Sequence, residues 1–292
     1  MSRIYEAIQR ADRERNATVE SQVKHGIEAT SAPCVVELPE IKSDLDLENI
    51  AHHPWKPFEA SLPTLATRGA SVEQFRALRS RIDQLRIQAA IKTILVSSGM
   101  PSEGKTFIAA NLAVSMARGS ANRILLIDGD LRRGTLHTLL GAPNEPGLTE
   151  YLSGTADLTN IMQRNVKPTG GAMHGISNVT FISAGLCSEN SSEIVVSRRM
   201  EELIAIVAPQ FDWIVIDSPP VLAVSDAIEL ARAADAVLLV ARAATTPFDV
   251  AQRTLAAFAN SRVLGFVLNA ASEVPRNQSY SYYYGKDDGQ RP

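Results

Sequence analysis

The 292-residue sequence predicts a doubly wound α/β domain built on a mostly parallel sheet. Its runs ILLID, WIVID and AVLLVA are apolar at nearly every position, as expected of strands that are buried on both faces of a parallel sheet. Helical segments lie between these runs, and this alternation is typical of strands joined by crossover helices. Apolar residues make up 45% of the chain, which is enough for a core of this kind.

The first 70 residues are expected to be a largely flexible N-terminal helix and linker. Residues 1–15 suit a short amphipathic helix, but a solvated terminus explains them equally well because an isolated helix of this length is marginal in water. Residues 16–68 alternate polar runs with five prolines and show no sustained period, which is typical of a linker.

Regular structure is predicted from residue 71 onward. Residues 71–89 suit a charged helix, and the strands follow it. The predicted strands are 93–97, 124–128, 179–183, 213–217, 236–241 and 264–268. Residues 71–275 are therefore expected to form the folded domain and residues 276–292 a flexible tail.

Charge and cysteine content exclude several classes of protein. A net charge of -3 gives no overall attraction to nucleic acid or to an anionic membrane. Cys34 and Cys187 are far apart and form no metal-ligand spacing, which fits a reducing compartment. No run approaches the roughly 18 apolar residues of a membrane span, and the N-terminus lacks the apolar stretch of a signal peptide. We therefore expect a cytoplasmic protein that reaches a membrane only through a partner.

The clearest motif is GMPSEGKT, which follows the apolar run TILVSS and precedes the helical segment FIAANLAVSMARG. It matches the P-loop pattern GxxxxGK[ST] in the strand-loop-helix context that the pattern requires. Its glycines let backbone N–H groups turn toward phosphates, and the helix N-terminus adds favourable partial charge. Lys105 would reach the β- and γ-phosphates, and the hydroxyl of Thr106 would bind Mg²⁺. The predicted nucleotide-binding residues are Gly99, Met100, Pro101, Ser102, Glu103, Gly104, Lys105, Thr106 and Phe107.

Three aspartates follow predicted strands. Asp128 and Asp130 end the run in ILLIDGDLRRG, and Asp217 ends WIVID. The carboxyl ends of parallel strands meet at the edge of the sheet where ligands bind. Carboxylates at such an edge suit Mg²⁺, although a single aspartate after a strand can simply cap the next helix. Together with the P-loop, the three favour a magnesium site.

Residues 71–284 resemble the bacterial P-loop tyrosine kinases, the autokinases that accompany exopolysaccharide synthesis and export. The resemblance rests on SSGMPSEGKT as Walker A, ILLIDGDLRR as Walker A′ and WIVIDSPP as Walker B. It implies ATP and Mg²⁺ as cofactors and protein tyrosines as substrates.

The resemblance also implies roles for individual residues. Lys105, Asp128 and Asp130 would be catalytic, with Asp128 as the base or orienting group for the attacking tyrosine hydroxyl. Thr106, Asp130 and Asp217 would hold Mg²⁺. A tyrosine hydroxyl with a pKa near 10 is mostly protonated at neutral pH, so an aspartate that accepts its proton is useful. The spacing does not distinguish the roles of Asp128 and Asp130.

The predicted phosphate acceptors lie in the C-terminal tail. Four of the six tyrosines of the chain are Tyr280, Tyr282, Tyr283 and Tyr284. A short polar tail cannot bury four aromatic rings, so an adhesive tail or a flexible acceptor segment are the two interpretations. The resembling family phosphorylates such clusters, which favours the acceptor. Each phosphate would add roughly -1.5 to -2 charges and repel its neighbours.

Self-association is a further expectation of the resemblance. Glu73, Arg76 and Arg79 recur at steps of three on the predicted helix 71–89, which alone indicates only a solvated charged face. Their spacing matches the Glu-x-x-Arg-x-x-Arg element of the family, which implies a ring-like homo-oligomer whose members phosphorylate each other's tails. Because the chain carries no membrane-spanning activator, the resemblance also implies a separate inner-membrane polysaccharide co-polymerase as partner.

Three other interpretations remain open. A ParA- or MinD-like ATPase switch shares the fold, but it resembles KGGxGK[ST] with a lysine where this sequence has Met100. An iron-sulfur carrier would need a cysteine pair that the chain lacks. A scaffold that binds ATP without chemistry would not need the aspartates. Asn269 resembles an adenine-contacting position or a turn residue, and Arg132 and Arg133 suit phosphates or a neighbouring subunit.

Overall fold

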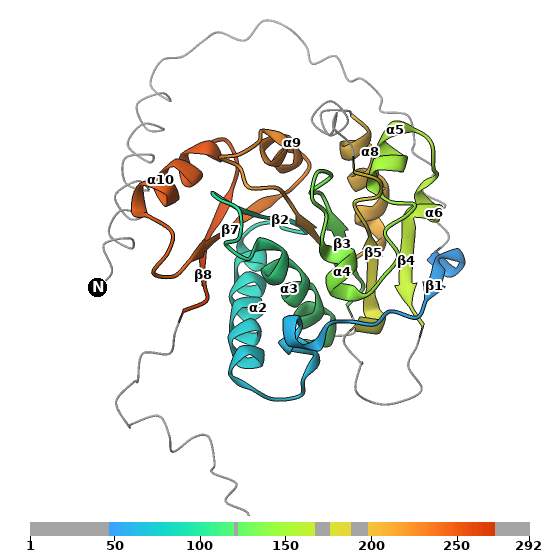
Figure 1. Ribbon diagram of the computed structural model, residues 1–292, viewed down its shortest axis with the longest axis horizontal. Helices are drawn as coiled ribbons and strands as arrows, with labels where there is room; N and C mark the ends of the chain where they lie inside the picture. Colours follow the sequence, from blue (N-terminus) through green and yellow to red (C-terminus); the bar gives the residue numbers. More distant parts are fainter. Residues whose placement is uncertain (1–46, 120–121, 167–175, 188–197, 272–292) are drawn as a thin grey trace, which may run out of the picture. The chain divides into compact units, whose positions relative to one another are not determined.

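An eight-stranded sheet runs through the residues that the computed structural model describes, namely 47–119, 122–166, 176–187 and 198–271 (Figure 1). Its strand order is β1-β4-β5-β3-β6-β2-β7-β8, and every neighbouring pair is parallel except β4 with β5. The strands are β1 (Ala51–His53), β2 (Thr93–Ser98), β3 (Ile124–Asp128), β4 (Met162–Asn165), β5 (Val179–Ile182), β6 (Trp213–Asp217), β7 (Ala236–Arg242) and β8 (Val263–Asn269). The predicted doubly wound, mostly parallel sheet is confirmed.

Helices cover both faces of the sheet (Figure 1). The α-helices are α2 (Ala70–Gln88), α3 (Lys105–Gly119), α4 (Leu136–Leu140), α5 (Leu148–Ser153), α6 (Leu158–Ile161), α8 (Arg199–Val207), α9 (Asp226–Arg232) and α10 (Phe248–Ala257). Short 3₁₀ turns are η1 (Leu47–Asn49), η2 (Glu59–Ser61), η3 (Pro63–Leu65), η5 (Ile176–Asn178) and η6 (Ala208–Gln210). Helices α2, α3 and α4 pack on one face, and α5, α6, α8 and α9 pack on the other.

The apolar runs of the sequence become strands with two buried faces. In β2, Ile94 and Val96 join the cluster under α2 and α3, whereas Leu95 between them joins the cluster on the opposite face. Successive side chains of a strand point to opposite faces, so both sets must be apolar when both faces are covered. Full burial of each such side chain contributes about 1.5–3 kcal/mol.

Residues 47–66, which the sequence analysis assigned to a flexible linker, instead pack on the domain. Strand β1 pairs with β4, and Trp55, 5% exposed, lies edge-on to Phe181 with ring centroids 6.0 Å apart. The N–H and hydroxyl groups of Thr64 both donate to Oδ1 of Asn111 on α3, at 3.2 and 2.7 Å. These contacts join residues far apart in sequence, so no local period could predict them. We call residues 47–66 the N-terminal strap.

Strands β1 and β4 were also missing from the sequence prediction. Their sequences AHH and MQRN are short and largely polar, and β4 runs antiparallel to β5 at the side of the sheet away from β8. Short polar strands carry little periodic signal, and their pairing is fixed by tertiary structure.

Candidate active site

The P-loop connects β2 to α3, as the motif predicted. Gly104 adopts a φ of +93°, and a Cβ at this position would collide with the side-chain amide of Asn269. Glycine is therefore required there by conformation and by close packing. Helix α3 begins at Lys105, so the unpaired N–H groups of its first turn border the loop and favour an anion.

Lys105 extends from the start of α3 to the carboxylates. Its Nζ lies 3.2 Å from Oδ2 of Asp130, and both side chains are largely buried. Burial alone would lower the pKa of Lys105, but the charges of Asp217 and Asp130 outweigh it and raise the pKa. The ammonium group therefore stays charged where a triphosphate would lie.

Asp128 and Asp217 are paired neighbours on β3 and β6, and both are fully or almost fully buried. The carboxylate of Asp128 accepts from the N–H groups of Asp130 and Leu136 at 3.2 and 3.0 Å. Burial, followed by the charge of Asp217, raises the pKa of Asp128 to about 8. Its side chain is thus fixed in position and binds a proton easily.

Asp217 differs because neither of its carboxylate oxygens finds a hydrogen-bond partner within the described residues. Burial raises the pKa of Asp217 to about 6, against the opposing charge of Lys105. Buried polar atoms are normally satisfied, so these two oxygens are suited to a ligand beside the hydroxyl of Thr106.

The donor atoms at this edge fit Mg²⁺. The hydroxyl of Thr106 and the carboxylates of Asp130 and Asp217 are hard oxygen donors, which this ion prefers. In the described parts of the chain, His, Cys, Asp and Glu side chains form no group of three able to enclose a metal ion. A bound Mg²⁺ would therefore take several of its ligands from nucleotide and water, as it usually does.

Gly129 lets the two aspartate strands approach each other. Its N–H donates to the carbonyl oxygen of Asp217 at 2.9 Å, and an added Cβ would lie only 2.7 Å from that oxygen. A side chain at this position would force β3 and β6 apart. The glycine of the Asp-Gly-Asp sequence is therefore required by the close approach of β3 and β6, whereas its two aspartates serve the chemistry of the site.

A buried acid inside the P-loop has a structural role that the sequence motif did not predict. Glu103 is only 4% exposed, and its carboxylate accepts from the N–H of Met100 at 2.7 Å and from the hydroxyl of Thr246. Asn269 donates from its side chain to the carbonyl oxygen of Glu103 at 2.9 Å. The loop after β7 and the end of β8 therefore hold the P-loop in shape. The signal in the sequence that could have revealed this role is a charged residue within a phosphate-binding loop.

The two arginines after Asp130 have different environments. Arg132 donates from Nε to the buried Asp226 at the start of α9, at 3.1 Å. Arg133 donates its backbone N–H to Oδ1 of Asp130 at 3.0 Å. Arg132 therefore connects the second aspartate motif to α9.

The residues of the charged triplet of α2 have different contact partners. Glu73 and Arg76 pair with each other at 2.5 Å, whereas Arg79 donates to the carbonyl oxygen of Ser115 on α3, at 2.7 Å.

Some predicted features lie outside the described residues: the acceptors Tyr280, Tyr282, Tyr283 and Tyr284, Cys34, and the helix predicted for residues 1–15. Across the described ranges, no helix is both long and apolar enough to span a bilayer.

A P-loop at the head of a helix, a buried lysine and three aspartates at one sheet edge define a P-loop nucleotide-binding protein. The family model described as AAA domain matches residues 91–256, in agreement with this class. Such a protein uses a nucleotide and typically a divalent metal ion.

Similarity to known proteins indicates the family within this class to which the chain belongs. The chain is 35% identical over 216 residues to the tyrosine-protein kinase wzc of Salmonella typhimurium, a match that covers 73% of this chain and 29% of that protein. It is 31% identical over 218 residues to the tyrosine-protein kinase YwqD of Bacillus subtilis, covering 74% of this chain and 87% of that protein. The solved kinase domain of the Escherichia coli tyrosine kinase ETK superposes with a TM-score of 0.60 at 31% identity, covering 70% of this chain and 79% of that one.

The chain belongs to the family of bacterial P-loop tyrosine-protein kinases, as the motifs predicted. It spans about a third of the length of several curated relatives that it matches, including the Salmonella kinase.

Proposed function

We propose that this protein is an ATP- and Mg²⁺-dependent tyrosine kinase that phosphorylates protein tyrosines. The observation that carries the proposal is the meeting of Lys105, Asp128, Asp130 and Asp217 at the P-loop edge of the sheet. Phosphoryl transfer depends mainly on positioning and on neutralising charge, and these residues supply both.

Each side chain has a distinct part in the proposed reaction. Lys105 neutralises the charge of the β- and γ-phosphates, and bound Mg²⁺ would add positive charge on the same oxygens. Asp128, held by two backbone N–H groups, orients the tyrosine hydroxyl and accepts its proton. Asp217, Asp130 and the hydroxyl of Thr106 would hold the metal ion. The buried setting strengthens these interactions because it excludes water.

The proposed acceptors are Tyr280, Tyr282, Tyr283 and Tyr284 of a neighbouring copy. Their clustering in a polar tail and the similarity of the chain to tyrosine-protein kinases support this assignment. We also propose a ring-like oligomer and a cytoplasmic location with recruitment to the inner membrane by a polysaccharide co-polymerase. In that setting the reaction would regulate exopolysaccharide synthesis and export.

The second candidate is an ATPase switch of the ParA or MinD type, which transfers the phosphoryl group only to water. Met100 stands where such switches carry an additional lysine, and its side chain is 45% exposed. A neutral thioether cannot neutralise phosphate charge, so this position favours the kinase.

Phosphate mapping by mass spectrometry after incubation with Mg²⁺ and ATP tests the kinase proposal. Phosphate on residues 280–284 should vanish with Lys105→Met and persist with the exposed control Lys56→Met. ATP hydrolysis with an unmodified tail would instead support the switch.

Light scattering tests the proposed assembly. Arg76→Ala combined with Arg79→Ala should reduce the assembly size, because both arginines belong to the predicted contact. An unchanged size would remove the ring from the proposal and leave the kinase activity untouched.

A further inference from the structure

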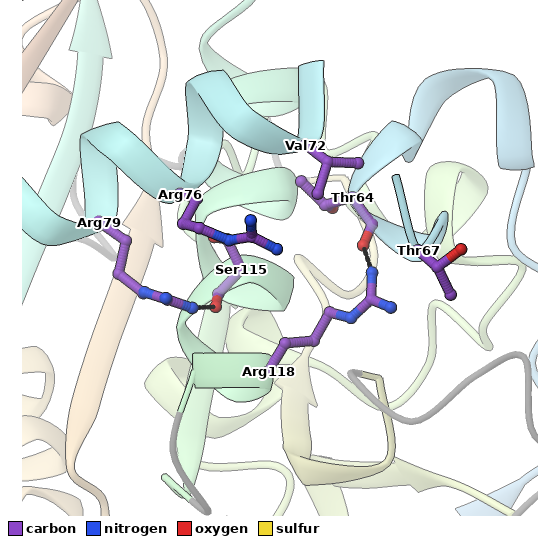
Figure 2. A pocket seen from close by; sticks show the side chains of 7 residues that line it. All are labelled: Thr64, Thr67, Val72, Arg76, Arg79, Ser115 and Arg118. Atoms are coloured by element: carbon purple, nitrogen blue, oxygen red, sulfur yellow. Dashed lines mark hydrogen bonds between the residues drawn. The ribbon is translucent and has the colours of Figure 1, made fainter. Parts of the chain in front are cut away.

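A pocket of about 250 Å³ lies between the N-terminal strap with its following residues, α2 and the C-terminal half of α3 (Figure 2). Its polar lining consists of Thr64, Thr67, Arg76, Arg79, Ser115 and Arg118. Ser115 lies ten residues after Lys105 on α3, so the pocket is roughly 15 Å along the helix from the phosphate loop. It is thus separate from the nucleotide site.

The pocket carries positive charge that the described residues do not neutralise. Arg79 donates to the carbonyl oxygen of Ser115 at 2.7 Å, and Arg118 donates to the carbonyl oxygens of Thr64 and Ala66. These acceptors are neutral, and neither arginine has a carboxylate within ion-pair distance in the described ranges.

Arg76, the third guanidinium, does have a carboxylate partner in Glu73, at 2.5 Å. Three guanidinium groups therefore line the pocket, and only that of Arg76 has a carboxylate partner among the described residues; Figure 2 shows Arg76 and Arg79 extending from α2 and Arg118 extending to Thr64. A guanidinium has five N–H donors, and the backbone carbonyls use only one or two from each of the other two arginines. Donors remain for a ligand.

The start of α2 adds to the attraction for an anion. This 19-residue helix begins at Ala70, and Gly69 before it provides no side-chain cap. The first N–H groups of an uncapped helix lack partners and favour negative charge. Val72 of this first turn lines the pocket, so the helix end borders it.

The size of the pocket limits the kind of ligand. Sites for drug-sized molecules usually measure about 300–1,000 Å³, so this pocket suits one anionic group better than a whole nucleotide. Guanidinium groups match phosphate oxygens in a two-bond geometry that a single ammonium group cannot provide.

We propose that this pocket binds a phosphate monoester dianion of the kind that phosphotyrosine carries. That a tyrosine carries the phosphate rests on the proposed kinase function, whereas the binding of a phosphate dianion rests on the pocket alone. Arg76 and Arg79 are also the residues predicted to mediate self-association. A phosphotyrosine bound here occupies these arginines and competes with assembly.

Fluorescence anisotropy with a labelled synthetic peptide of residues 280–284, phosphorylated on its tyrosines, tests the proposal. The full chain is used with Mg²⁺ and a non-hydrolysable ATP analogue, so that the P-loop is filled. The phosphopeptide should bind and the unphosphorylated peptide should not. Arg79→Gln and Arg118→Gln should each weaken binding about tenfold or more, since each removes a charged donor. Arg81→Gln, on the exposed side of the same helix, is the matched control and should have no effect.

Equal affinity of the native protein and the Arg79→Gln variant would overturn the site. So would loss of binding on Asp128→Asn without loss on Arg79→Gln, because the peptide would then occupy the active site. If inorganic phosphate displaces the phosphopeptide and binds with the same affinity, the pocket is supported as an anion site and its ligand is the free phosphate ion.

Two features keep the test interpretable. Arg118 also holds the N-terminal strap, so thermal unfolding is measured for each variant, and Arg79→Gln decides the outcome if Arg118→Gln unfolds. The peptide is synthetic, so failure of the kinase proposal does not affect the result. Arg118 lies outside the charged triplet of α2, and its substitution therefore separates anion binding from self-association.

Discussion

Replacing Asp217 by asparagine should stabilise the protein without ligand and greatly weaken the further stabilisation that nucleotide provides. The carboxylate is buried, and neither oxygen has a hydrogen-bond partner among the described residues. Its negative charge is therefore a cost of folding that Lys105 offsets only in part and that a bound cation would offset further. Asparagine keeps the shape and removes the charge.

The magnitude follows from the shifted pKa. Burial raises the pKa of Asp217 from 3.8 to about 6, so ionisation at pH 8 costs about 3 kcal/mol. Lys105 loses a favourable neighbour in the variant, which offsets part of the gain. We expect a net stabilisation of about 1–2 kcal/mol at pH 8, or roughly 2–8 °C in the midpoint of thermal unfolding.

The pH dependence has a defined sign. A carboxyl group whose pKa is raised by folding destabilises the native state above the folded pKa and does not do so below the unfolded pKa. The advantage of Asp217→Asn should therefore be small near pH 4 and should grow through pH 6 to its full value near pH 8.

Thermal unfolding followed by circular dichroism at pH 5 and pH 8 measures this effect. Mg²⁺ with a non-hydrolysable ATP analogue should stabilise the native protein strongly and the Asp217→Asn variant little, because the metal loses a ligand. Asp235→Asn is the matched control, since Asp235 accepts from two backbone N–H groups at 2.7 and 2.8 Å and its loss should destabilise. A ligand-free Asp217→Asn variant that is less stable than the native protein at pH 8 would refute the reasoning.

Three further predictions concern other parts of the structure. Trp55→Ala should lower the free energy of unfolding by about 3–5 kcal/mol in urea titrations, because it removes a buried ring from the N-terminal strap; a change below 1 kcal/mol would mean that the strap does not pack as described. Thr246→Val should weaken nucleotide binding in calorimetric titrations and cost about 1–3 kcal/mol of stability, because Oε1 of the buried Glu103 loses its donor while Oε2 keeps the N–H of Met100, whereas Thr246→Ser should behave like the native protein. Glu73→Gln breaks only an exposed ion pair with Arg76 and should change stability by less than about 1 kcal/mol; a larger loss would show that the pair is shielded from solvent.

The sequence by itself determined six of the eight strands of the sheet and the identity of the phosphate site. Both depend on local signals: a strand buried on two faces is apolar at every position, and a P-loop needs its glycines, lysine and hydroxyl at fixed spacing. Asp128 and Asp217 could also be placed at one edge, because each ends a strand of a parallel sheet. All six predicted strands are present, and residues 71–89 correspond to α2.

Only the tertiary structure decided what packs around that framework. The N-terminal strap looked like a linker because its anchors, Trp55 and Thr64, contact residues 47 or more positions away and leave no local period. The hydrogen bond from Thr246 to Glu103 joins residues 143 positions apart. Whether a buried carboxylate such as Asp217 has a partner depends on every segment that surrounds it. Such contacts arise when distant segments meet in the fold, and the identity and spacing of neighbouring residues do not encode them.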